Sequence, residues 1–203
     1  QGGISVGAEA LNLSGSGISS DGALRNLSGN NSWSGAFTLG AASTIASDSG
    51  TLTLSGNVTN GGFVSTFTGA GNVTASGIIS GTGGLTKSGA GTMTLLGGNT
   101  FSGDMYITGG TVQVGNGSTI GTLGSGRVLA GTAGANLIFN RSDAITVTNA
   151  TGTINNTVQA APAIVANGIA LNADFSEINS SGGANGVSLT SVTGTSNFGG
   201  GAL

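Results

Sequence analysis

Few residues in this chain could carry out chemistry. It has no histidine and no cysteine, and charged residues make up 5% of its 203 residues. A Ser–His–Asp triad needs histidine as its base, a cysteine protease needs a thiol, and zinc sites prefer these same two side chains. The sequence therefore predicts no catalytic residue, no metal site and no cofactor, and we expect the protein not to be an enzyme.

Two carboxylates are close enough in sequence to be considered for acid–base chemistry. Asp174 and Glu177 are separated by two residues, and glycosidases act through a pair of carboxyl groups. Because the chain has only seven acidic residues in all, solvated loop positions are the simpler interpretation. A polysaccharide-degrading enzyme remains the less favoured function. The surrounding stretch, 172–178, is also the one place where we consider a helical turn.

The aromatic residues have two possible uses, stacking on sugar rings or packing inside the protein. Trp33 and Phe101 lie in matching stretches, Asn-Ser-Trp-Ser-Gly and Asn-Thr-Phe-Ser-Gly, so we expect both rings to occupy the same interior slot. Tyr106 is expected to be half exposed. We therefore name Tyr106, Asp174 and Glu177 as the residues of a possible recognition surface, with a host or matrix glycan as the ligand.

Charge argues against several classes of partner. The four basic residues are spread along the chain, and the net charge is −3 with an isoelectric point near 4.3. Such a chain cannot form the basic stripe that neutralises phosphates, so we expect no nucleic-acid binding. No apolar run approaches the roughly 20 residues of a membrane-spanning helix, so we expect no membrane span in this segment. Because the sequence begins at Gln1, without Met, we expect it to be part of a longer protein.

Short strands must position these residues. Segments such as 85–87, 92–96, 105–108 and 111–114 alternate Thr or Ser with Leu, Ile, Val or Met, the period-2 pattern of a strand with one buried face. Glycine, 42 residues in all, separates them, and glycine permits the positive φ of sharp corners. Since 37% of the residues are hydrophobic, the pattern indicates an ordered all-β protein and not a disordered one.

The strand pattern repeats along the chain. Gly-Thr-Leu-Thr-Leu-Ser-Gly at 50–56 matches Gly-Thr-Met-Thr-Leu-Leu-Gly at 91–97. No such segment can bury itself, so we expect successive copies to stack as coils of about 20–25 residues. We further expect Asn57, Asn72 and Asn99 to form ladders of stacked amides at the corners.

Residues 85–115, Leu-Thr-Lys-Ser-Gly-Ala-Gly-Thr-Met-Thr-Leu-Leu-Gly-Gly-Asn-Thr-Phe-Ser-Gly-Asp-Met-Tyr-Ile-Thr-Gly-Gly-Thr-Val-Gln-Val-Gly, form a run that resembles the autotransporter-associated β-strand repeat of bacterial secreted passenger regions. The departures are mild: Met93 and Val112 replace leucines, Phe101 replaces a tyrosine, and Asp104 and Met105 replace small polar residues. The resemblance implies a structural scaffold that lies outside the cell or on the bacterial outer surface, with a link to adhesion.

These observations together predict an all-β protein, a right-handed parallel β-helix (β-solenoid) with very little helix. We expect residues 1–150 to form the repeat region and residues 151–203 to form degenerate coils or a C-terminal cap. The expected function is structural, as a rod, spacer or fibre subunit of a surface or secreted autotransporter-like protein. The expected partners are copies of the chain or neighbouring coils of the same parent protein. An adhesin or carbohydrate-binding module is the alternative.

Overall fold

The computed structural model describes residues 3–119, 121–130 and 135–139, together with the backbone of seven strands beyond them. In the described residues, the regular secondary structure consists of strands and one 3₁₀ turn, η1 (Ile18–Ser20). The chain divides into two compact units, Gln1–Leu137 and Ile138–Leu203. The expected boundary after residue 150 stays a prediction.

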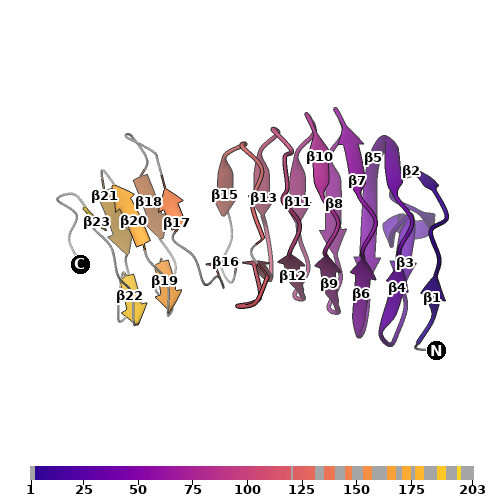
Figure 1. The fold of residues 1–203 in the computed structure, drawn as a ribbon, viewed down its shortest axis with the longest axis horizontal. Coiled ribbons are helices and arrows are strands. Elements are labelled where there is room, and N and C mark those ends of the chain that lie inside the picture. Colours follow the sequence, from indigo (N-terminus) through magenta and orange to yellow (C-terminus); the bar gives the residue numbers. More distant parts are fainter. Residues whose placement is uncertain are drawn as a thin grey trace. The chain divides into compact units, whose positions relative to one another are not determined.

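The strands of the first unit form three walls, which we call A, B and C (Figure 1). Wall A contains β1 (Ser5–Val6), β4 (Asn31–Trp33), β6 (Thr51–Leu54), β9 (Asn72–Ala75), β12 (Thr92–Leu95), β14 (Thr111–Val114) and β16 (Asn136–Phe139). Wall B contains β3 (Leu24–Asn26), the second half of β5 (Phe37–Ser47), β8 (Ser65–Thr68), β11 (Leu85–Lys87), β13 (Met105–Ile107) and β15 (Val128–Ala130). Wall C contains β2 (Leu11–Gly15), the first half of β5, β7 (Val58–Gly61) and β10 (Ile79–Gly81).

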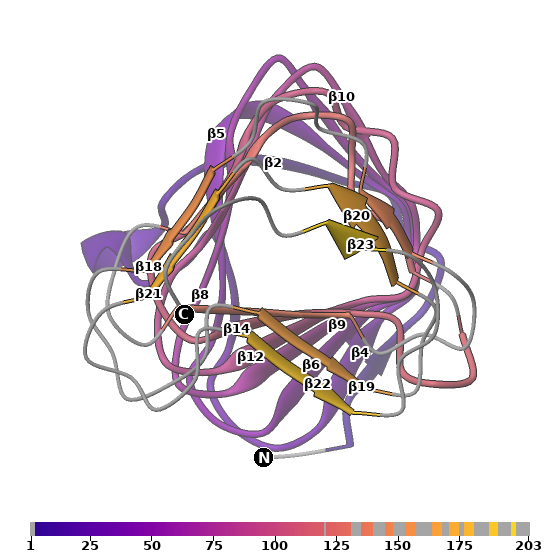
Figure 2. The ribbon, with the colours of Figure 1, turned by 90° about the vertical axis from the view of Figure 1, so that its left-hand side faces the viewer.

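Each wall is a parallel ladder between successive coils. On wall C, Phe37 pairs with Val58 and Val58 pairs with Ile79, so the same step along the sequence is taken twice. The first coil takes a longer step, from Leu11 to Phe37, because it also contains η1. Figure 2, an end-on view, shows the coils of this unit superimposed as roughly three-sided loops. The predicted β-solenoid is therefore confirmed, with about five turns.

The core is made of side chains stacked from coil to coil. On wall A, alternate residues of each strand point inward. They form two buried rows: Leu52, Val73, Met93 and Val112 in the first, and Leu54, Ala75, Leu95 and Val114 in the second. Burying a Val, Leu or Met side chain stabilises a fold by about 1.5–3 kcal/mol. No single strand could gain this energy alone, because its partners come from the coils on either side.

The corners are columns of glycine. Gly35, Gly56, Gly77 and Gly97 stand above one another at the turn from wall A to wall C. A Cβ on Gly56, Gly77 or Gly97 would come within 3.0 Å of the backbone of the glycine one coil earlier. Glycine is therefore needed here because the backbones approach closely, and the φ angles of these residues lie outside the left-handed region.

The expected amide ladders are wrong, because each asparagine bonds to backbone instead. Asn57 Oδ1 accepts a hydrogen bond from Ile78 N–H at 3.0 Å. Asn72 Oδ1 does the same for Thr92 N–H at 2.9 Å. The register explains the difference, since the residue aligned with each of these asparagines on the following coil is Ile78 or Thr92 and not another amide.

Asn99 joins three coils. Its Oδ1 accepts a buried hydrogen bond from Ile79 N–H at 2.8 Å. Its Nδ2 donates to the carbonyl oxygen of Thr122 at 2.6 Å. The side chain therefore links the coil before its own to the coil after it.

The second unit also consists of parallel pairs. One sheet holds β17 (Ile145–Val147), β20 (Leu171–Asp174) and β23 (Ser196–Asn197). The other two are β18 (Thr153–Asn156) with β21 (Glu177–Ser180), and β19 (Ile164–Asn167) with β22 (Val187–Thr190). Every pair joins strands that are three apart in sequence order, so this unit too is built from stacked three-strand coils.

Candidate functional site

Tyr106 lies at the centre of a small polar site on the outside of wall B. It is the middle residue of β13, between the inward-facing Met105 and Ile107. By register it stands between Thr86 of β11 and Leu129 of β15. Tyr106 is 44% exposed, as the sequence predicted.

An ion pair is located beside Tyr106. Asp104 immediately precedes β13, and Arg127 immediately precedes β15. Arg127 Nη2 donates to Asp104 Oδ2 at 2.6 Å, and Arg127 Nε donates to Oδ1 at 3.3 Å. The backbone N–H of Arg127 also donates to Asp104 Oδ1, at 3.1 Å. The guanidinium is held in a fixed orientation by this fork, although its side chain is 76% exposed.

The ion pair sets the electrostatics of the site. Hydrogen bonds from Arg127 hold the pKa of Asp104 below its ordinary value. The hydrogen bond to Asp104 raises the pKa of Arg127, and the negative charge of Asp104 acts in the same direction. Asp104 is therefore ionised at neutral pH and cannot serve as a general acid there.

Asp174 and Glu177 lie in the second unit. Asp174 is the last residue of β20 and Glu177 the first residue of β21, and these strands belong to different sheets. The helical turn considered for residues 172–178 is wrong, because both flanks of this stretch are strand. The side chains of Asp174 and Glu177 lie outside the described part of the structure, so their role in recognition stays a prediction.

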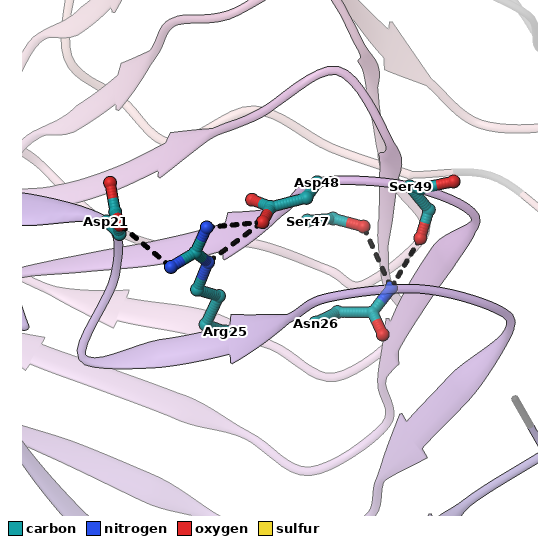
Figure 3. Close-up of polar contacts among 6 residues, drawn as sticks. All are labelled: Asp21, Arg25, Asn26, Ser47, Asp48 and Ser49. Atoms are coloured by element: carbon teal, nitrogen blue, oxygen red, sulfur yellow. Dashed lines mark hydrogen bonds and ion pairs between the residues drawn. The ribbon is translucent and has the colours of Figure 1, made fainter. Parts of the chain in front are cut away.

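Sequence analysis missed a second charged cluster, at the start of wall B (Figure 3). Arg25 of β3 lies between two carboxylates: Nη1 donates to Asp21 Oδ2 at 2.8 Å, and Nη2 donates to Asp48 Oδ2 at 2.6 Å. The hydrogen bond to Asp48 is the main cause of the raised pKa of Arg25. The stacking of coils brings Asp48 of the following coil beside Arg25, which a local reading of the sequence could not detect.

A shallow cavity of about 380 Å³ adjoins Arg25 and is lined also by Ile18, Asp21 and Leu27. Ile18 is 91% exposed at the tip of η1. The neighbouring Ser19 has a φ of 57°, a left-handed conformation that is uncommon for residues other than glycine. This loop projects from the coil between β2 and β3.

Lys87 is buried inside wall B. It is 3% exposed and stands, by register, between Phe67 and Ile107. Its Nζ donates to three carbonyl oxygens, those of Ser88 at 2.6 Å, Gly89 at 2.9 Å and Gly109 at 3.3 Å. Burial lowers the pKa of Lys87 to about 8. The contact with Gly109 reaches the following coil, so this lysine is a link between coils and is inaccessible to a ligand.

The expectation that Trp33 and Phe101 share one slot is wrong. Trp33 lies in β4 on wall A, aligned with Val6 and Leu54. Phe101 is buried in the connection that follows β12, beside Gly124. Phe101 does pack inside the coils, as expected, whereas Trp33 is only partly buried and lines a cavity of about 180 Å³ at the first coils.

The described residues contain no group of three or more His, Cys, Asp or Glu side chains that could hold a metal ion. Among these same residues, no helix has the length and apolar character needed to span a membrane.

Comparison with known proteins supports the resemblance seen in the sequence. Residues 85–114 match the family described as passenger-associated-transport-repeat. An adhesin, the BmaC autotransporter of Brucella suis biovar 1 (strain 1330), is 46% identical over 57 residues, which cover 28% of this chain and 2% of that protein. No solved structure matches the chain. The chain therefore carries a passenger-type repeat, and the matched part is a small fraction of that relative's length.

Proposed function

We propose that this chain is a spacer segment in the passenger of a larger autotransporter-like protein, located outside the cell or on the bacterial outer surface, and that it is not an enzyme. The observation that carries the proposal is the unbroken stacking of coils in the first unit. Each complete coil adds one strand to wall A and one to wall B, and strands in a sheet are about 4.8 Å apart. A chain folded in this way gains length in proportion to its number of residues.

The contacts between coils support a stiff spacer. The glycine column of Gly35, Gly56, Gly77 and Gly97 brings successive backbones into close contact. Asn99 and Lys87 add side-chain bonds that cross from one coil to the next. Bending the unit between two coils would break several of these contacts at once, so we expect it to behave as a rod.

The charged residues support a non-enzymatic role. A general acid at neutral pH needs a carboxyl group with a raised pKa, whereas the pKa of Asp104 is lowered. Asp21 and Asp48 are both bound to Arg25. None of these three carboxylates is arranged as the acid of a glycosidase.

The free edges of the first coil support continuation of the stack. Within the described residues, β1, β2 and β3 each pair with another strand on one side only. We propose that neighbouring coils of the same parent protein cover these edges, and that self-association into a fibre is the alternative. Electron microscopy and light scattering of the purified chain distinguish the two: short isolated rods support the spacer, and filaments would replace it with a fibre subunit.

A surface-display experiment tests the location. The chain is inserted between an N-terminal epitope and the translocating domain of an autotransporter. We expect the epitope to reach the surface of intact cells, where added protease removes it. Retention of the fusion inside the cell would contradict the proposal.

A further inference from the structure

We propose that Tyr106, Asp104 and Arg127 form a binding site for a hexopyranose ring of a neutral oligosaccharide. This inference goes beyond the spacer function, which needs no ligand, and its failure would leave the spacer function in place.

The first argument is the position of Tyr106 in its row. The outward positions of wall B aligned with it on earlier coils are occupied by Thr44, Thr66 and Thr86. Tyr106 is the first large ring in this row, and Leu129 follows it on the next coil. Of the tyrosine, 44% is exposed. An aromatic ring has a negative face that attracts polarised C–H groups, and tyrosine adds a polar hydroxyl at its tip. The apolar face of a pyranose ring presents such C–H groups.

The second argument is the polar edge beside the ring. Arg127 uses its N–H, Nε and Nη2 groups to bind Asp104. Among the described residues, no acceptor is bonded to its Nη1. Because Asp104 fixes the guanidinium, the N–H groups of Nη1 are oriented before any ligand arrives, which reduces the entropy cost of binding. Sugar hydroxyls accept from such donors and can donate to the carboxylate of Asp104.

The third argument concerns charge and decides between classes of ligand. Asp104 neutralises Arg127 locally, and the whole chain carries a net charge of −3. The site therefore offers no net positive potential to attract a carboxylate, sulfate or phosphate. The face of Tyr106, together with the donor Arg127 and the acceptor Asp104, therefore fits a neutral sugar best.

The test is a titration of the full chain with cellohexaose, maltohexaose, laminarihexaose and mannohexaose, with the anionic hexagalacturonate in parallel, followed by NMR chemical shifts and calorimetry. We expect at least one neutral hexasaccharide to bind. Tyr106→Ala should weaken this binding about tenfold, and Tyr106→Phe should retain most of it. Arg127→Lys should weaken it as well, because lysine lacks the planar fork.

Phe63→Ala is the matched control, since Phe63 is a comparably exposed aromatic residue (41%) on the same unit. It should leave the binding unchanged. Circular dichroism of each variant checks that the fold is intact, and Arg127→Lys keeps the test valid if Tyr106→Ala is unstable. The proposal is overturned if no neutral probe binds at millimolar concentration, if only hexagalacturonate binds, or if Phe63→Ala weakens binding as much as Tyr106→Ala.

Discussion

Gly97 and Gly98 are adjacent in sequence, yet we expect alanine to have opposite effects at the two positions. A Cβ at Gly97 would come within 3.0 Å of the carbonyl oxygen and carbon of Gly77. A Cβ at Gly98 would meet nothing within 4 Å. Neither residue has a positive φ, so backbone strain is not a factor at either position.

The size of the effect follows from these surroundings. The atoms in the way of a Cβ at Gly97 are backbone and cannot rotate aside, so the two coils must separate locally. Forcing extra volume into a packed position costs typically about 1–3 kcal/mol. At Gly98 the same methyl group meets open space and reduces the entropy of the unfolded chain, which stabilises a protein by about 0.4–1 kcal/mol. The two variants should differ by roughly 1.5–4 kcal/mol in the free energy of unfolding.

Urea unfolding followed by far-ultraviolet circular dichroism measures this difference. We expect a lower midpoint for Gly97→Ala than for the wild type, and an unchanged or slightly higher midpoint for Gly98→Ala. Native-state hydrogen exchange should show the loss of protection on the coils that contain Gly77 and Gly97. Equal midpoints for the two variants, or a larger loss at Gly98, would refute the stacking of glycine on glycine at this corner.

Three further predictions concern the links between coils. The pKa of Lys87 in the folded protein, about 8, lies below the pKa of roughly 10.4 of an unfolded lysine. Between these two pH values the lysine is protonated in the unfolded chain and mostly deprotonated in the folded protein. The free energy of unfolding should therefore rise by about 1–3 kcal/mol as the pH rises through this window, and a wild-type rise that persists in Lys87→Met would contradict this. Asn99→Ala deprives a buried backbone N–H of its acceptor and should cost about 1–3 kcal/mol in urea unfolding, whereas Asn72→Ala, whose bond is exposed, should cost less than about 1 kcal/mol. A second copy of residues 58–78, inserted directly after the first, should add one coil in register. We expect the rod to lengthen by about 4.8 Å in X-ray scattering and the thermal midpoint to be no lower. A collapsed or unfolded product would contradict the idea that coils are independent units.

The strands could be predicted because their signal is local. Segments 85–87 and 111–114 have the expected bounds, since inward and outward residues alternate along each of them between glycine corners. Residues 37–47 form one long strand, β5. It continues around the corner between walls C and B, because small residues, Gly40-Ala41-Ala42, let the backbone bend without interruption.

The partners of side chains could not be predicted in the same way, because they depend on the register between coils. Asn57 and Asn72 look like members of a ladder in the sequence, yet the lengths of their coils align them with Ile78 and Thr92 respectively and not with other amides. The prediction that Trp33 and Phe101 occupy the same slot was wrong for the same reason, since their similar pentapeptides lie at different points of the coil.

The inward position of Lys87 is indicated by the sequence itself. In Leu85-Thr86-Lys87 the lysine has the same phase as Leu85, so the period-2 rule already predicts that it points inward. An inward lysine must find acceptors, and the three carbonyl oxygens around Nζ provide them. A charged residue at an inward position of a repeat can therefore be interpreted as a bond between coils.

In a stacked protein, inward and outward rows of side chains are subject to different constraints. Inward rows are fixed by packing, so an inward residue that differs in type from its neighbours in the row has a structural reason. Lys87, between Phe67 and Ile107, is an example. Outward rows are under no such constraint, so threonine repeats wherever good strand propensity suffices. A residue that differs from the rest of an outward row, such as Tyr106 after a series of threonines, is not required by the packing of the core. The glycan titration is therefore centred on Tyr106, because it tests whether this outward ring binds a ligand from outside.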